Sequence, residues 1–381
     1  MLEREGVNNL KRLIKKLVRD GVKNKADWHL WRKKEDNERF MEKMFDYQKI
    51  GDMPKINALV SAFFHPEEPL IGLNYTPVAH NALHNFKSGW TLPLMLCRGI
   101  IFDRRAKLVA KPFLKFFNFG ENEQTINLPN ESFDATVKHD GHLGIIFKYN
   151  GKVFLTTRGS FTSPSSIVGN EMIKKLGQKW ADDYPDNLTT LVEIIHSLTK
   201  VILYYEQEGF ILIGANNVRT LRDYDYKNLL KLGRKINLSV TAVWQGNSIA
   251  DLRQLMKDRS IANQEGFVAR FASGLRVKFK FATYIGKMFE AKLIYGYLMR
   301  NMVKGKLDEK LNFLPAEGKI RAQEMLKDIF AVKEIIDLDD RSLAKKQREY
   351  LYLLEAEERR SNSYKTTCRS FLLFLKSESK K

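Results

Sequence analysis

Residues 133–147 read FDATVKHDGHLGIIF, and this stretch decides the fold. Its first part alternates apolar and polar side chains up to Lys138, which predicts a strand with one buried face. Its second part is apolar and leads through Asn150-Gly151 to another apolar run at residues 153–155, a pattern typical of a β-hairpin. We therefore expect Lys138 at the end of a sheet, followed by a glycine that lets a ligand approach the backbone.

A second informative stretch lies far downstream. Residues 265–271 (EGFVARF) form a strand-like run, and residues 275–281 (LRVKFKF) follow after a short turn. In the second run, apolar side chains alternate with Arg276, Lys278 and Lys280, so a strand there projects three cations from one face. That face is either an ordinary solvated surface or the cationic wall of a phosphate-binding site.

Taken in order along the chain, these segments resemble the covalent nucleotidyltransferase superfamily, which contains ATP-dependent ligases and mRNA capping enzymes. Residues 138–141 (KHDG) resemble its motif I, and residues 191–195 (LVEII) resemble motif III. Residues 265–268 (EGFV) resemble motif IV, and residues 277–280 (VKFK) resemble motif V. The order of these four segments is the order in which the family carries them.

Upstream segments narrow the resemblance to the phage RNA ligase 1 family. They are residues 97–102 (CRGIIF) and residues 111–118 (KPFLKFFN). Arg158-Gly159-Ser160 is similar to that family's Lys-Gly-Ser, with arginine in place of lysine. The resemblance extends from Asn74 to Phe281 and implies an ATP-dependent RNA ligase.

The resemblance also implies a role for each matched residue. Lys138 is expected to attack the α-phosphate of ATP and carry AMP covalently, and Lys280 is expected to be catalytic close to the reacting bond. Glu265 is expected to hold Mg²⁺ or Mn²⁺, directly or through water. The expected nucleotide-binding residues are Arg98 and Lys115 on the β- and γ-phosphates, Phe117 in support of that site, Gly141 and Glu193 at the ribose, Val268 at the adenine, Lys278 and Lys280 on the α-phosphate, and Arg158, whose contact the change from lysine to arginine leaves open.

The attacking lysine must be uncharged, and cations near it can favour that form. A lysine attacks phosphorus only when deprotonated, and with an ordinary pKa of about 10.4 only roughly one lysine in a thousand is uncharged near neutral pH. Neighbouring cations and a divalent metal disfavour the ammonium form. The candidates are Arg98, Lys115, Lys278 and Lys280, and the same cations can stabilise pyrophosphate as it leaves.

Several of these residues also have a purely structural interpretation. Glu193 lies in an apolar run, where a buried ion pair is the alternative to a ligand contact. Phe117 and Val268 are suited to a hydrophobic core, and Arg98 to an ordinary strand end. We expect no catalytic role for His139.

Composition and charge favour a polyanionic partner. The chain has 381 residues, a formal net charge of +19 and a hydrophobic content of 44%, which together indicate a globular protein that binds phosphates. A basic surface also suits an anionic membrane, but no apolar run is long enough to span one, and the N-terminus does not resemble a signal peptide. The two cysteines, Cys97 and Cys368, predict neither a disulfide framework nor a zinc site, so an intracellular location, cytoplasmic or host cytoplasmic, is expected.

Three regions emerge along the chain. Residues 1–50 predict a basic helical segment packed on the main domain, with Leu10, Leu13 and Leu17 on one helix face. Residues 51–288 predict an α+β nucleotidyltransferase domain built on antiparallel sheets, with residues 201–205 among its strands. Residues 289–381 predict an all-α C-terminal domain, in which substrate preference is expected to lie.

The resulting hypothesis is an ATP-dependent RNA ligase that joins 3′-hydroxyl and 5′-phosphate ends through lysyl-adenylate and RNA-adenylate intermediates. Its expected substrate is single-stranded RNA or nicked tRNA in RNA repair, with a separate kinase or phosphatase that prepares the ends. A tRNA-splicing-type ligase domain with other end requirements is an alternative. A capping guanylyltransferase would use GTP and usually carries a C-terminal OB-fold, whereas this C-terminus reads helical. A non-catalytic RNA- or nucleotide-binding module is the alternative of another class.

Overall fold

The computed structural model describes residues 2–83, 86, 89–199, 201–257, 264–291, 298, 301, 306–312, 314, 316, 318–320 and 322–327. The chain divides into two units between Phe279 and Lys280, ahead of the boundary predicted after residue 288. The second unit contains α12 (Ala282–Ala291) and α14 (Leu307–Asn312). Most of the predicted all-α domain lies outside the described residues.

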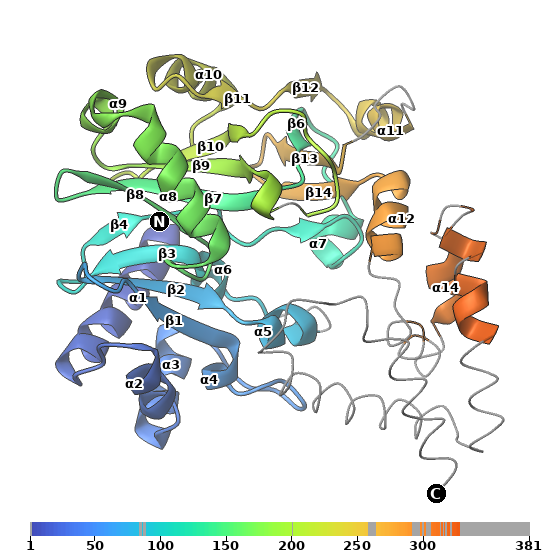
Figure 1. Ribbon diagram of the computed structural model, residues 1–381. Helices are drawn as coiled ribbons and strands as arrows, with labels where there is room; N and C mark the ends of the chain where they lie inside the picture. Colours follow the sequence, from blue (N-terminus) through green and yellow to red (C-terminus); the bar gives the residue numbers. More distant parts are fainter. Residues whose placement is uncertain are drawn as a thin grey trace, which may run out of the picture. The chain divides into compact units, whose positions relative to one another are not determined.

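The first unit begins with the helices α1 (Leu2–Arg19), α2 (Lys25–Trp31), α3 (Glu35–Met44) and α4 (Ile56–Leu59). Leu10, Leu13 and Leu17 are buried on the predicted face of α1. A capping box between Asn24 and Asp27 starts α2. These helices share one hydrophobic core with the first sheet and lie along one side of it (Figure 1).

The first sheet is antiparallel and has the order β1-β2-β3-β4. Its strands are β1 (Val60–Phe64), β2 (Leu70–Tyr75), β3 (Arg98–Asp103) and β4 (Leu108–Ala110). Between β2 and β3 the chain forms the short helices α5 (Pro77–Ala82) and α6 (Leu92–Leu96).

The second sheet has the order β11-β10-β9-β7-β8 and contains the predicted hairpin. Its strands are β7 (His142–Tyr149), β8 (Lys152–Thr157), β9 (Leu188–Ile195), β10 (Gly209–Asn217) and β11 (Ser239–Val240). Asn150 and Gly151 both have positive φ at the hairpin turn, as their residue types favour. Helices α8 (Pro164–Leu176), α9 (Gln178–Asp183) and α10 (Tyr226–Lys235) pack on this sheet, and the short helix η2 (Ser197–Thr199) follows β9.

The third sheet has the order β12-β6-β13-β14-β5. Its strands are β5 (Phe117–Asn118), β6 (Phe133–Lys138), β12 (Val243–Gly246), β13 (Gly266–Phe271) and β14 (Arg276–Lys280). Helices α7 (Glu123–Ile126) and α11 (Ile249–Lys257) accompany it. Both runs that carry the downstream motifs are therefore strands, as predicted.

The predicted α+β class is confirmed, but the antiparallel-sheet prediction is wrong for two of the three sheets. The pair β10/β11 is parallel, and so is the pair β14/β5. Residues 201–205 form no strand, because the backbone N–H groups of Ile202 and Leu203 donate to the Asp140 carboxylate instead of to a neighbouring strand.

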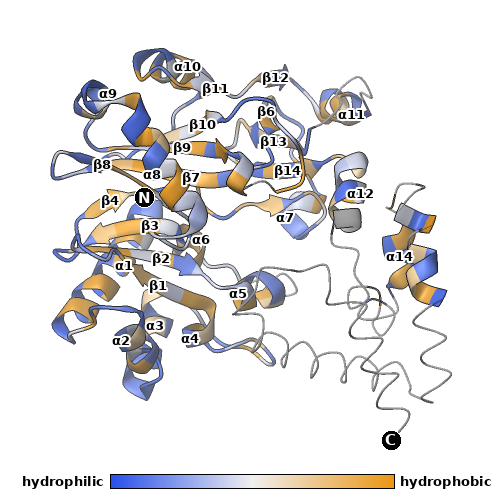
Figure 2. Ribbon diagram, in the orientation of Figure 1, coloured by the Kyte–Doolittle hydropathy of each residue, from blue (hydrophilic) through white to orange (hydrophobic). Residues whose placement is uncertain are grey.

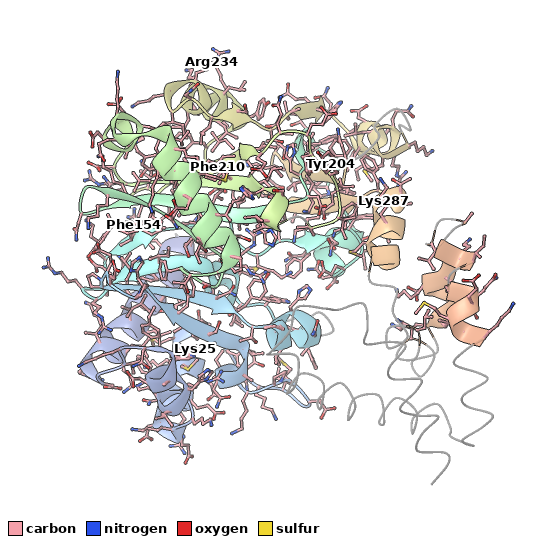
Figure 3. The ribbon with its side chains drawn as sticks, in the orientation of Figure 1. Lys25, Phe154, Tyr204, Phe210, Arg234 and Lys287 are labelled. Atoms are coloured by element: carbon pink, nitrogen blue, oxygen red, sulfur yellow. The ribbon has the colours of Figure 1, made fainter. Side chains whose placement is uncertain are left out.

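Hydrophobic residues concentrate in the strands at the centre of the first unit (Figure 2). The charged ends of basic residues such as Arg234 on α10 project away from the body (Figure 3). Among the described residues, no helix combines the length and apolar character that crossing a bilayer requires.

Candidate active site

Lys138 lies where the chain crosses from the third sheet to the second. It is the last residue of β6, and β7 begins at His142. In the antiparallel pairing of β6 with β13, Lys138 lies opposite Gly266, so Glu265, the residue before Gly266, lies next to it. The Lys138 Nζ lies 2.5 Å from a Glu265 carboxylate oxygen, and the Glu265 side chain is only 5% exposed. The motif I lysine is therefore held as one half of an ion pair.

The residues after Lys138 are fixed by contacts with distant segments. The Asp140 carboxylate accepts hydrogen bonds from the backbone N–H groups of Ile202 (2.8 Å) and Leu203 (2.6 Å). The Asp140 N–H donates to the Tyr205 hydroxyl at 2.8 Å. A ring nitrogen of His139 lies 3.1 Å from the Thr241 hydroxyl, and burial lowers the pKa of His139 to about 4, so the ring is neutral near pH 7. These contacts position the loop that follows the lysine.

Gly141 permits a close approach between this loop and β9. A Cβ atom there would meet the Ile194 carbonyl oxygen at 2.4 Å. The Gly141 N–H donates to a Glu193 carboxylate oxygen at 3.1 Å. The glycine thus brings the motif III carboxylate within reach of the motif I loop.

Burial raises the pKa of Glu193 to about 7. The Lys138 charge opposes this rise, the neighbouring Glu265 adds to it, and the hydrogen bond from Gly141 opposes it. Glu193 consequently changes charge near neutral pH, unlike an exposed glutamate. A carboxyl group with a pKa displaced by burial is characteristic of functional sites, although structural networks also produce it.

Strand β14 places Arg276 and Lys278 on one face, as the alternation predicts. Burial lowers the pKa of Lys278 well below its ordinary value, and the charges of Arg98, Lys115 and Lys138 lower it further. The Lys278 Nζ lies 4.7 Å from the centre of the Phe116 ring. Lys280 ends the strand and begins the second unit, where its Nζ lies 5.3 Å from the Tyr284 ring.

Arg98 begins β3 and lies over the Phe116 ring at 5.1 Å. One of its terminal nitrogens, Nη1, is buried and has no hydrogen-bond partner among the described residues. The next residue, Gly99, has φ +95°, and a Cβ there would lie 3.1 Å from the Arg158 backbone. Glycine at this position therefore allows the two arginines to come together.

Lys115 is 4% exposed and lies among aromatic rings. Its Nζ lies 4.2 Å from the ring centre of Phe117, 5.1 Å from that of Trp90 and 5.7 Å from that of Tyr75. Burial lowers the pKa of Lys115 to about 8, Glu121 opposes this change, and Arg98 and Arg158 add to it. Phe117 is thus both a buried core residue and the nearest ring to this cation, so its two interpretations coexist.

Arg158 follows β8 and donates from Nη1 to the Tyr75 hydroxyl at 2.6 Å. Sequence reasoning missed Tyr75, because no motif or periodicity distinguishes it from other tyrosines at strand ends. It also missed Phe116 as the ring between Arg98 and Lys278, although Phe116 lies inside the quoted 111–118 segment.

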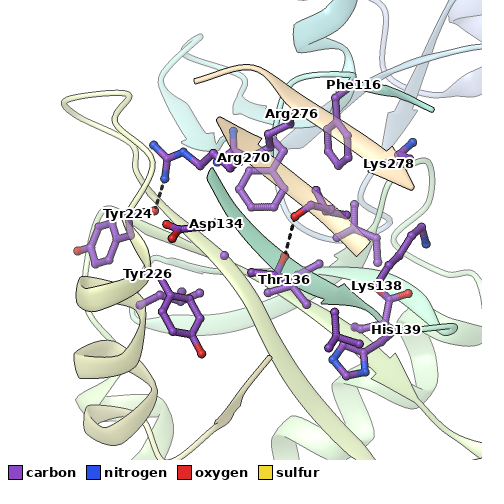
Figure 4. A pocket seen from close by; sticks show the side chains of 18 of the residues that line it. Phe116, Asp134, Thr136, Lys138, His139, Tyr224, Tyr226, Arg270, Arg276 and Lys278 are labelled. Carbon is purple, nitrogen blue, oxygen red and sulfur yellow. Dashed lines mark hydrogen bonds between the residues drawn. The ribbon is translucent and has the colours of Figure 1, made fainter. Parts of the chain in front are cut away.

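A pocket of about 210 Å³ joins these elements. Its lining includes five of the predicted residues, together with side chains from all three sheets and α10. Figure 4 shows Lys138 and His139 at one end, and Arg270, Tyr224 and Tyr226 at the other. The Thr136 hydroxyl donates to the Val268 carbonyl at 3.3 Å within this pocket. The five predicted lining residues are Arg98, Lys138, Glu193, Val268 and Lys278.

The cations around the site fall into two groups. Lys138 is paired with Glu265, Arg276 with Asp223 at 2.6 Å, and Lys111 with Glu3 at 2.6 Å. Within the part of the chain that the structure describes, Arg98, Lys115, Arg158 and Lys278 have no carboxylate within 4.0 Å. Four neighbouring cations without carboxylate partners fit a polyanionic ligand such as a triphosphate.

The residues present also fit a hard divalent cation. Mg²⁺ is usually held by one or two carboxylates together with substrate phosphates and water. Glu265 and Glu193 are close enough for their charges to interact. The described residues contain no cluster of three or more potential metal ligands, so further ligands would come from phosphate and water.

Residues 96–285 match the model of the RNA ligase family, and this part of the chain belongs to that family. It is 28% identical over 182 residues to a putative RNA ligase of Thermovibrio ammonificans, which covers 45% of this chain and 46% of that protein. It is 26% identical over 187 residues to a putative bifunctional polynucleotide kinase/RNA ligase of Autographa californica nuclear polyhedrosis virus, covering 42% of this chain and 26% of that protein. The chain thus matches less than half the length of either curated relative.

Solved structures give distant similarities. An archaeal ATP-dependent RNA ligase shares 13% identity at a TM-score of 0.49, over 73% of this chain and 76% of that one. A Naegleria gruberi RNA ligase mutant with ATP and Mn shares 13% identity at a TM-score of 0.35, over 41% of this chain and 50% of that one.

Proposed function

We propose that this protein is an ATP-dependent RNA ligase that becomes adenylylated on Lys138. One geometric observation carries the proposal: Lys138, paired with Glu265, ends a strand beside four cations, and among the described residues those four have no carboxylate within 4.0 Å. Membership of residues 96–285 in the RNA ligase family supports the same reaction.

In the first step, the Lys138 nitrogen attacks the α-phosphorus of ATP. A nitrogen–phosphorus bond forms, the bond to the β-phosphate oxygen breaks, and pyrophosphate leaves with the electron pair. Because Lys138 is held against Glu265 as an ammonium, it must first lose a proton, either to Glu265 or to water. Lys278 and Arg98 stabilise the charge on the phosphates as it moves toward the leaving group.

Glu265 would hold the divalent cation, directly or through water, while Glu193 would bind the ribose. When bound, Mg²⁺ or Mn²⁺ neutralises phosphate charge and favours the uncharged amine. Because Glu265 is also the partner of Lys138, holding the cation there would weaken this ion pair and favour release of the Lys138 amine. Lys280 is assigned to the α-phosphate and Val268 to the adenine by the motifs they occupy.

In the later steps, a 5′-phosphate oxygen of RNA takes AMP from Lys138, and a 3′-hydroxyl then displaces AMP to seal the strand. The net positive charge of the chain suits this partner. One relative's name combines polynucleotide kinase with RNA ligase, so end preparation by a separate kinase is part of the proposal. Repair of single-stranded RNA or nicked tRNA is the proposed context.

The test is incubation with α-labelled ATP or GTP and a divalent metal, followed by denaturing electrophoresis. Wild-type protein and the control variant Lys152→Ala, whose side chain is 73% exposed on β8, should take up label from ATP. Lys138→Ala should take up none. Labelling of Lys138→Ala would place the nucleophile elsewhere, and labelling by GTP alone would favour a capping reaction. No label on folded wild-type protein would favour a non-catalytic binding module.

A further inference from the structure

Among the described residues, Tyr75 lies beside three of the cations that fit a triphosphate, Arg98, Lys115 and Arg158. It ends β2, is 5% exposed, and lies outside the segment that matches the RNA ligase family. Its hydroxyl accepts a hydrogen bond from Arg158 at 2.6 Å, and its ring lies 4.7 Å from the Arg158 guanidinium. The same ring lies 5.7 Å from the Lys115 Nζ.

Arg98 also interacts with Tyr75. Burial lowers the pKa of Arg98, and the neighbouring Tyr75 oxygen opposes this change. Both arginines can only donate, because a guanidinium carries no acceptor. The Tyr75 oxygen accepts from Arg158 at 2.6 Å and lies close enough to Arg98 to favour its charged form.

The proton of the Tyr75 hydroxyl remains to be accounted for. Within the described part of the chain, no acceptor for it is found. Among the described residues, Arg98 Nη1 is likewise buried without a partner. In that part of the chain, two neighbouring donors without acceptors, one O–H and one N–H, fit a ligand rich in acceptor oxygens.

We propose that Tyr75 is a positioning residue that gathers Arg98, Lys115 and Arg158 into a binding site for the pyrophosphate part of ATP, and that its own hydroxyl donates to that group. This inference rests on the proposed adenylylation of Lys138. It assigns Tyr75 to the leaving group and not to the nucleoside, so the residue matters only when pyrophosphate enters or leaves.

The reverse of the first step isolates this role. Added pyrophosphate attacks AMP on Lys138, so the nitrogen–phosphorus bond breaks, ATP forms and the lysine takes up a proton. Transfer of AMP from Lys138 to a 5′-phosphorylated RNA involves no pyrophosphate. A variant that loses only the pyrophosphate site should therefore release AMP poorly when pyrophosphate is added but transfer AMP to RNA normally.

The experiment uses the full chain, labelled on Lys138 with α-labelled ATP and freed of nucleotide. Tyr75→Phe keeps the ring and removes the hydroxyl. Tyr47→Phe is the matched control, because Tyr47 is also 5% exposed and its hydroxyl donates to the Pro54 carbonyl at 2.6 Å, in another part of the unit. Release of label is measured against pyrophosphate concentration, and label transfer is measured with 5′-phosphorylated RNA.

Tyr75→Phe should need ~10- to 100-fold more pyrophosphate for half-maximal release, the loss typical of one hydrogen bond to a charged group. Its label transfer to RNA should equal that of wild type and Tyr47→Phe. An unchanged pyrophosphate requirement, or an equal loss in both reactions, would overturn the inference while leaving the ligase proposal intact. Failure of the wild type to take up label would instead overturn the proposed function.

Discussion

Replacement of Glu193 by glutamine should make the protein more stable in alkaline solution. It should also remove the part of the pH dependence of the unfolding free energy that comes from Glu193. In the folded protein burial raises the pKa of Glu193 from its ordinary 4.5 to about 7. The unfolded chain therefore releases the Glu193 proton at a lower pH than the folded protein does. The stability that depends on a protonated Glu193 is fully present below pH 4.5 and is lost as the pH rises through about 7.

The magnitude follows from the two pKa values. One pKa unit corresponds to about 1.36 kcal/mol, so a rise from 4.5 to about 7 costs about 3 kcal/mol at pH 8 once the group is ionised. Glutamine stays neutral and can still accept the hydrogen bond from Gly141. Partial solvent access to Glu193 makes this figure an upper limit.

The assay is urea-induced unfolding of wild type and Glu193→Gln at several values between pH 4.5 and 8. The difference in unfolding free energy should grow across this interval in favour of the variant. Glu171→Gln is the control, because the Glu171 side chain is 58% exposed on α8. A difference that stays constant with pH would refute the argument, since it would mean that Glu193 ionises alike in both states.

Two further substitutions probe the frame around the site. Asp223→Asn should cost about 3–5 kcal/mol of unfolding free energy, because it leaves Arg276 and Lys111 buried without that carboxylate. Burial alone would raise the pKa of Asp223, but Arg276 and Lys111 outweigh it and lower the pKa from its ordinary 3.8, so the stability advantage of the wild type should shrink as the pH falls below about 4. Asp183→Asn, at an exposed position, should change the unfolding free energy little. Gly141→Ala should lower stability by about 1–3 kcal/mol and reduce labelling by ATP, because its Cβ would meet the Ile194 carbonyl oxygen at 2.4 Å. Gly209→Ala, which has open space around its Cβ, is the matched control for both thermal unfolding and labelling.

Features set by local sequence were predictable. The Asn150-Gly151 hairpin, the apolar face of α1 and the alternation in β14 depend on periodicity and turn chemistry, and the structure has all three. The pairing of Lys138 with Glu265 follows from the register of β6 on β13, which periodicity does not determine.

Features set by distant contacts were not predictable. Residues 201–205 have a strand-like composition, yet their N–H groups bind Asp140. Both parallel pairs involve two-residue strands, β5 and β11, whose partners are chosen by the fold around them. The contacts on which the proposed role of Tyr75 rests form only where β2, β3 and the end of β8 meet.

The manner in which the cations are held explains how a folded protein can keep an anion site open. A carboxylate partner would neutralise a buried cation and compete with phosphate for it. An aromatic ring stabilises the same cation through its quadrupole, by about 0.5–2 kcal/mol, and leaves its positive charge available. Lys115 lies 4.2 Å from the Phe117 ring, Arg158 4.7 Å from the Tyr75 ring, and Arg98 and Lys278 share the Phe116 ring. Arg276 also lies over a ring, 4.2 Å from that of Phe113, but it has the Asp223 carboxylate as well; among the described residues, the lack of such a carboxylate is what distinguishes the cations proposed to bind the triphosphate.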